Sequence, residues 1–195
     1  MKSYKLNLLY LALLLCSLNV ASVLAQDANK IWTSVASTGT VDESDQGEIA
    51  FTGPFATFSA AAAPSARAII RYNVTAVDGL FVAPGPLWWP NLIVNYRDNG
   101  PDARVQVYLR EYDFLTASVT PFKQIVFDSD QYAADNDYQT RTVGNCGNFG
   151  VFDFVPNNQT VHAYFIEVHF YRANTGGNPG LGGLAVSRYG VCLGQ

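Results

Sequence analysis

The chain has 195 residues, of which 49% are hydrophobic and 14% are charged, with 16 Asp and Glu against 12 Lys and Arg. An acidic chain is not expected to bind nucleic acid or an anionic membrane surface, because both select basic proteins. The length suits one domain with a single hydrophobic core.

Residues 1–25 have the three parts of a secretory signal peptide. Two lysines open the segment, residues 6–15 form an apolar run, and the small-residue pattern at 23–25 precedes a cleavage site. We therefore expect a secreted or extracytoplasmic protein (periplasm or cell exterior) whose mature domain is residues 26–195. Its net charge would be −6, since both lysines are lost. The alternative is an uncleaved membrane anchor; after cleavage we expect no membrane span.

The mature chain consists of short β-strand patterns separated by Gly, Pro, Asn and Asp. Weaker strands are expected at 31–36, 48–52, 56–60, 122–127, 140–144, 151–155 and 184–191. Four clear alternating segments lie between them, at 66–77, 91–97, 103–112 and 160–173. Their predicted buried residues are Ile70, Tyr72, Val74, Ala76, Leu92, Val94, Tyr96, Val105, Val107, Leu109, Tyr164, Ile166, Val168 and Phe170. This pattern predicts an all-β fold, a single antiparallel β-sandwich of jelly-roll or immunoglobulin-like topology.

Two cysteines, Cys146 and Cys192, remain after signal cleavage. An even pair in an exported protein favours a disulfide over a metal or redox site. Closing so long a loop would stabilise the fold by about 4 kcal/mol in the chain-entropy model. The expected bond ties the last strand to the turn region around residue 146.

Two segments match the N-glycosylation acceptor pattern, at Asn73-Val74-Thr75 and Asn158-Gln159-Thr160. Chance produces this pattern often, so it carries little weight here. The first match lies within an alternating strand, where a glycan would need an open sheet face.

Acidic loops raise the hypothesis of a calcium site, because Ca²⁺ takes six to eight oxygen ligands. The loop at 42–48 is one candidate. The segment 128–137 is the better one, with Asp128, Asp130, Asp135 and Asp137. Neither loop has the spacing of an EF-hand, and solvated acidic turns are the favoured alternative.

Catalytic constellations are sparse. His162 and His169 lie seven residues apart on one strand and therefore point to opposite faces. Glu111 and Glu167 are glutamates inside strands, and paired carboxylates perform glycoside hydrolysis. Because Glu167 and His169 share a face, they form the best catalytic candidate with Glu111 as a second partner. The alternative is solvated strand residues or ion pairs with arginine.

Two adjacent tryptophans precede the strand at 91–97. Side-chain alternation through Pro90 gives Trp88 the parity of the buried face and Trp89 the parity of the polar face. A hairpin centred on Gly100-Pro101 would place Trp89 opposite Tyr112 and Ile93 opposite Tyr108. In the same register Asn95 would lie opposite Gln106 and Asn91 opposite Arg110.

Our first hypothesis is a non-catalytic binding or adhesive module with an extracellular carbohydrate as its ligand. Aromatic rings beside amide and guanidinium groups can bind a sugar through its C–H face and its hydroxyls. The predicted ligand-binding residues are Trp89, Tyr108, Tyr112, Asn95 and Arg110. The alternatives are a covered face with satellite core aromatics, a glycan-acting enzyme, and a structural envelope or matrix component.

Overall fold

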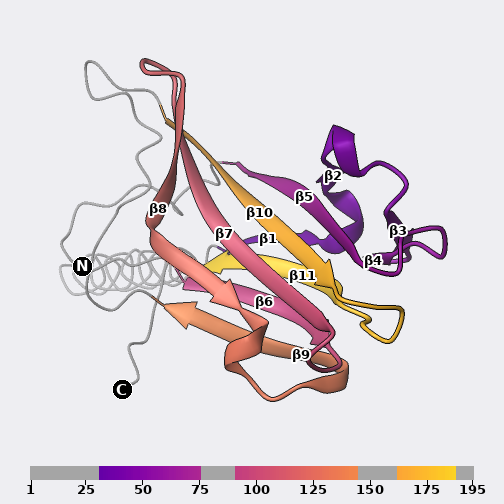
Figure 1. The fold of residues 1–195 in the computed structure, drawn as a ribbon. Coiled ribbons are helices and arrows are strands. Elements are labelled where there is room, and N and C mark those ends of the chain that lie inside the picture. Colours follow the sequence, from indigo (N-terminus) through magenta and orange to yellow (C-terminus); the bar gives the residue numbers. More distant parts are fainter. Residues whose placement is uncertain (1–30, 76–90, 145–161, 188–195) are drawn as a thin grey trace, which may run out of the picture.

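The computed structural model describes residues 31–75, 91–144 and 162–187, and these residues form eleven strands (Figure 1). Three short 3-10 turns accompany them: η2 (Ala36–Thr38), η3 (Glu43–Asp45) and η4 (Ser129–Gln131). The strands are β1 (Ile31–Val35), β2 (Thr40–Val41), β3 (Ile49–Thr52), β4 (Phe55–Phe58), β5 (Ala66–Val74), β6 (Asn91–Asp98), β7 (Ala103–Asp113), β8 (Ser118–Asp128), β9 (Asp135–Gly144), β10 (His162–Arg172) and β11 (Gly180–Ser187). The described residues contain no α-helix, and no helix among them is long and apolar enough to cross a membrane.

The strands form two antiparallel sheets. The first sheet has the order β3-β4-β11-β6-β9, with β1 also paired to β11; the second has the order β2-β5-β10-β7-β8. From β4 to β11 the chain changes sheet at every step except between β7 and β8. This strand order is that of a jelly roll. The predicted all-β sandwich is therefore confirmed.

The hydrophobic core lies between the sheets and contains the residues that the alternation predicted. From the four clear segments, thirteen of the fourteen predicted residues are described, and each is at most 3% exposed. Ala76 lies outside the described residues. Large side chains pack across the interior, as where the rings of Tyr96 and Phe127 meet edge to face at 4.7 Å. Full burial of one such side chain is worth roughly 1.5–3 kcal/mol.

The predicted hairpin between 91–97 and 103–112 is wrong. β6 pairs with β11 and β9 in the first sheet, whereas β7 pairs with β10 and β8 in the second. The connection is an arch, in which Asp98 is buried and its Oδ1 accepts a hydrogen bond from the Gly100 N–H at 3.1 Å. Both strands turn their apolar residues inward, so alternation is the same in an arch and in a hairpin.

The weaker predicted strands are present where the structure describes them. The segments at 31–36, 48–52, 56–60, 122–127 and 140–144 correspond to β1, β3, β4, β8 and β9. β11 covers the first part of the segment at 184–191. The segment at 151–155, the pair Cys146 and Cys192, and the signal segment lie outside the described residues.

Candidate functional site

The outer surface of the second sheet carries charged and aromatic side chains from four adjacent strands, β5, β10, β7 and β8. Residues opposite each other in a ladder point to the same side of the sheet. Arg71 (β5) is opposite Glu167 (β10), which is opposite Tyr108 (β7). In the next row His169 is opposite Gln106. We call this surface the polar face; it comprises Arg67, Arg71, Arg104, Gln106, Tyr108, Arg110, Asp128, Glu167, His169 and Tyr171.

Glu167 is held between two arginines at the centre of the polar face. Its Oε1 accepts a hydrogen bond from Arg71 Nε at 3.1 Å, and its Oε2 accepts one from Arg110 Nε at 2.8 Å. Arg71 also contacts Asp42, with 2.5 Å between Nη1 and Oδ2. Burial alone would raise the pKa of Glu167, but the two guanidinium groups outweigh it and the pKa is lowered. Glu167 is therefore ionised at neutral pH.

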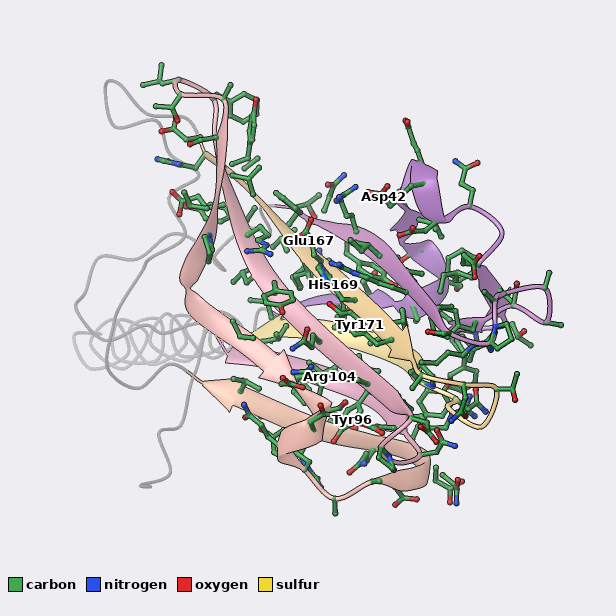
Figure 2. The ribbon with its side chains drawn as sticks, in the orientation of Figure 1. Asp42, Tyr96, Arg104, Glu167, His169 and Tyr171 are labelled. Atoms are coloured by element: carbon green, nitrogen blue, oxygen red, sulfur yellow. The ribbon has the colours of Figure 1, made fainter. Side chains whose placement is uncertain are left out.

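His169 is buried although it belongs to the outer side of the sheet. The ring of Tyr108 covers it, with centroids 4.9 Å apart. Arg67 Nη2 lies 3.2 Å from its Nδ1, and because arginine only donates, Nδ1 must be the acceptor. Burial lowers the pKa of His169, the adjacent Glu167 carboxylate opposes this, and the ring is neutral at pH 7. Figure 2 shows Glu167, His169 and Tyr171 in succession along β10.

Among the described residues, the remaining proton of this imidazole has no hydrogen-bond acceptor. Nε2 of His169 is buried, and Glu167 Oε2 lies 3.6 Å away, beyond hydrogen-bond distance. A second contact at Nδ1 comes from the Tyr171 hydroxyl at 3.3 Å. The imidazole is thus fixed in orientation by its neighbours.

Tyr108 is fixed in place by its neighbours. The guanidinium carbon of Arg110 lies 4.6 Å from the centre of its ring, a cation–π distance. Its hydroxyl donates to Gln106 Oε1 at 2.9 Å, and Gln106 Nε2 donates to Asp128 Oδ2 at 2.9 Å. Arg104 Nε is the last member of this hydrogen-bond network and donates to Asp128 Oδ1 at 2.9 Å. Each side chain therefore has a defined geometry before any ligand arrives.

The structure brings together only part of the predicted binding surface. Tyr108 and Arg110 are in direct contact on the polar face. Tyr112 lies farther along β7, where its ring meets Phe114 edge to face at 4.9 Å. Asn95 is on the outer side of the first sheet and donates to Thr140 Oγ1 at 3.0 Å, so it cannot join this site. Trp89 lies outside the described residues, as does Trp88.

The catalytic candidates are likewise only partly joined. Glu167 and His169 are neighbours, as predicted from parity. Glu111 lies opposite Tyr164, on the other side of the second sheet, and its Oε1 is 2.9 Å from His162 Nδ1. Glu111 and Glu167 therefore cannot act on one glycosidic bond.

The carboxylates of the polar face are unsuited to donate a proton. Burial would raise the pKa of Asp128, but hydrogen bonds from Arg104 and Gln106 lower it below its ordinary value. Glu167 is lowered in the same way. Glycoside hydrolysis needs one carboxyl group with a raised pKa that remains protonated. Neither carboxylate of the polar face meets this requirement.

The acidic segment 128–137 is divided between two places. Asp128 and Asp130 both contact Arg104, while Asp135 Oδ1 accepts a hydrogen bond from the Asp137 N–H at 3.0 Å. In the described part of the chain, no three His, Cys, Asp or Glu residues gather closely enough to hold a metal ion. A calcium site stays a prediction.

A pocket of about 210 Å³ opens beside the polar face, between β1 of the first sheet and β5 of the second. Its lining includes the aromatic residues Trp32 and Tyr72 and the polar residues Thr33, Asn73 and Arg71. The pattern at 31–36 indicates only a weak strand. Nothing in the order of residues there indicates that Trp32 lines a pocket with residues of β5.

No protein-family model and no curated protein sequence matches the chain. Among solved structures, a family two carbohydrate esterase from Cellvibrio japonicus is similar at 10% identity and a TM-score of 0.39, over 83% of this chain and 34% of that one. The xylan-binding module CBM15 is similar at 13% identity and a TM-score of 0.44, over 82% of this chain and 97% of that one. A family 11 carbohydrate-binding module from Clostridium thermocellum, in complex with a β-1,3-1,4-mixed-linked tetrasaccharide, is similar at 9% identity and a TM-score of 0.34. The match covers 82% of this chain and 88% of that one. The chain thus spans about a third of the esterase chain, and likenesses this remote leave its function to be argued from its own residues.

Proposed function

We propose that this protein is a non-catalytic β-sandwich module that binds an extracellular carbohydrate on the polar face. The observation that carries the proposal is the fixed geometry around Tyr108. Its ring, the Arg110 guanidinium and the Gln106 amide contact one another along β7, and the Gln106 amide is also tied to Asp128 on β8. Sugars bind to such sets, because rings receive their C–H faces and planar polar groups receive their hydroxyls.

The side chains of the polar face are already ordered, which favours ligand binding. A flexible side chain loses rotamer entropy when a ligand orders it, which costs about 0.5–1.5 kcal/mol for each one. Here Arg110 is already tied to Glu167 at 2.8 Å, and Gln106 is tied to Asp128 at 2.9 Å. A ligand would meet groups that are already ordered.

The alternative of a glycan-acting enzyme is supported only by the proximity of Glu167 and His169 and by the raised pKa of Asp130, whose side chain is half exposed. Glu167 and Asp128 are both held as carboxylates by arginine, and Glu111 is on the other side of the sheet. A purely structural component would need no aromatic ring with fixed polar neighbours on an outer sheet surface.

The proposal includes export from the cell, with residues 1–25 removed and Cys146 joined to Cys192. Both features rest on the sequence patterns alone. Mass spectrometry of the secreted protein, with and without reduction, measures the new N-terminus and the number of free thiols. An N-terminus at residue 26 and no free thiol are expected.

Binding to a panel of polysaccharides tests the function. Retardation in gels containing soluble polysaccharides, and depletion by insoluble ones, should be measured for the wild type, Tyr108→Ala and Tyr138→Ala. Tyr138 is a matched control, because it is a partly buried tyrosine on the outer side of the first sheet. Loss of one stacking ring should weaken binding about tenfold in Tyr108→Ala, equivalent to roughly 1.4 kcal/mol.

The control should bind like the wild type. Equal binding by Tyr108→Ala and the wild type would show that the ligand lies elsewhere. If the wild type binds no member of the panel, the proposed function is wrong.

A further inference from the structure

We propose that the pocket between β1 and β5 binds a single neutral sugar residue, the end or a branch of the glycan held by the polar face. This inference rests on the proposed function and adds the site and the class of sugar. The pocket touches the polar face at Arg71, which belongs to both. A glycan that leaves the face past Arg71 would enter it.

The size of the pocket selects one sugar ring. Its volume of about 210 Å³ is below the roughly 300–1,000 Å³ of pockets for drug-sized ligands. That space accommodates one pyranose with its hydroxyl groups and excludes a longer stretch of chain.

The lining is mainly polar and includes two aromatic residues. The Trp32 and Tyr72 side chains are buried, at 7% and 3% exposure, and Tyr72 is anchored by donating its hydroxyl to Ala36 O at 2.7 Å. The side chains of Thr33, Thr40 and Asn73 have no hydrogen-bond partner among the described residues. Anchored aromatic residues beside hydroxyl and amide groups that have no partner among the described residues are a combination that can receive a sugar ring.

Charge balance selects a neutral sugar over a uronate. Arg71 is the charged residue in the lining, and its guanidinium is already paired with Asp42 and Glu167. Glu167 is in turn shared with Arg110, so two carboxylates balance two guanidinium groups. A carboxylate ligand would meet no net positive charge, whereas hydroxyl groups can still bond to this ion-pair network.

The experiment measures the affinity of neutral oligosaccharides by calorimetry. The double variant Thr33→Val/Asn73→Ala removes two polar groups from the pocket and leaves the polar face intact. Thr142→Val is the matched control, because Thr142 is exposed on the outer side of the first sheet. Protein from a bacterial host leaves Asn73 without a glycan, and circular dichroism establishes that each variant is folded.

The double variant should bind neutral oligosaccharides about 5–20-fold more weakly, the effect of one or two lost hydrogen bonds. Thr142→Val should bind like the wild type. Affinity should change less than about twofold between 50 mM and 500 mM NaCl, because salt does not screen an uncharged ligand. A twofold change is about the precision of the titration. Crystals soaked with the shortest oligosaccharide that binds should show one sugar ring between Trp32 and Asn73.

Three outcomes overturn the inference, and they are distinguishable. If wild type and double variant bind equally while Tyr108→Ala fails to bind, the pocket is not a sugar site and the proposed function stands. If only uronate-containing glycans bind, and salt weakens them, the assignment of a neutral sugar is wrong. If the wild type binds no glycan, the proposed function falls and takes the inference with it.

Discussion

Glu167→Gln tests whether the arginine clamp, in which Arg71 and Arg110 both donate to Glu167, organises the polar face. The side chain of Glu167 is 14% exposed and accepts hydrogen bonds from Arg110 at 2.8 Å and from Arg71 at 3.1 Å. A charge-assisted hydrogen bond contributes about 1.5–3 kcal/mol. Arg71 is 43% exposed and keeps Asp42 as a partner, so solvent screening reduces its share, whereas Arg110 is 20% exposed. Because Gln retains one acceptor oxygen, we expect a loss of about 2 kcal/mol of unfolding free energy.

Urea unfolding monitored by circular dichroism measures this loss. Glu43→Gln is the control, because Glu43 is exposed and has no ion pair among the described residues; its stability should stay within about 0.5 kcal/mol of wild type. Double-mutant cycles with Arg110→Met and Arg71→Met divide the effect, and the coupling energy should be larger for Arg110. A Glu167→Gln protein as stable as the wild type would refute the clamp, as would a larger coupling to Arg71.

Two further predictions concern stability. Because the pKa of His169 is lowered in the fold, the unfolded chain binds the proton more readily, so stability should fall as the pH drops below about 6.5, the unfolded-state value. Urea unfolding at pH 7.5, 6.0 and 5.0 should show a loss that His169→Gln reduces; an equal loss in both proteins would contradict the burial of a neutral imidazole. Gly39→Ala should cost about 1–3 kcal/mol, because the added Cβ would lie 2.3 Å from Ile70 Cγ2 in the packed core. Gly47→Ala is the comparison: its added Cβ meets open space at φ +94°, and it should cost only about 1 kcal/mol in a parallel unfolding series. A larger loss of stability in Gly47→Ala than in Gly39→Ala would argue against the packing at Gly39.

The core could be predicted from alternation, but the pairing of strands could not. Residues such as Val94 and Val107 recur at every second position, and that period alone marks them as inward-facing. The turn at Gly100-Pro101 is compatible with both a hairpin and an arch. The choice depends on which strands lie beside β6, and its neighbours β9 and β11 are distant in sequence.

In the candidate site, too, the facing of each side chain could be predicted from alternation, but the neighbouring of strands could not. Parity placed Tyr108 and Arg110 together on an outer surface, and Glu167 with His169 on another strand. That these two strands are neighbours follows only from the pairing of β7 with β10. For the same reason Asn95 was assigned to the wrong surface, since the expected hairpin with β7 does not form. The burial of His169 depends on the overlying Tyr108 ring, a contact that periodicity does not encode.

The central claim is that a glycan lies on the polar face of the second sheet. Titration of the ¹⁵N-labelled protein with neutral hexasaccharides derived from xylan, cellulose and mannan maps the contact directly by amide chemical shifts. With at least one of these ligands, the largest shifts should come from Tyr108, Arg110 and Glu167, and from Thr33 and Asn73 at the pocket. Shifts confined to Asn95, Tyr138 and their neighbours on the first sheet, or no shifts with any of the three, would contradict the account.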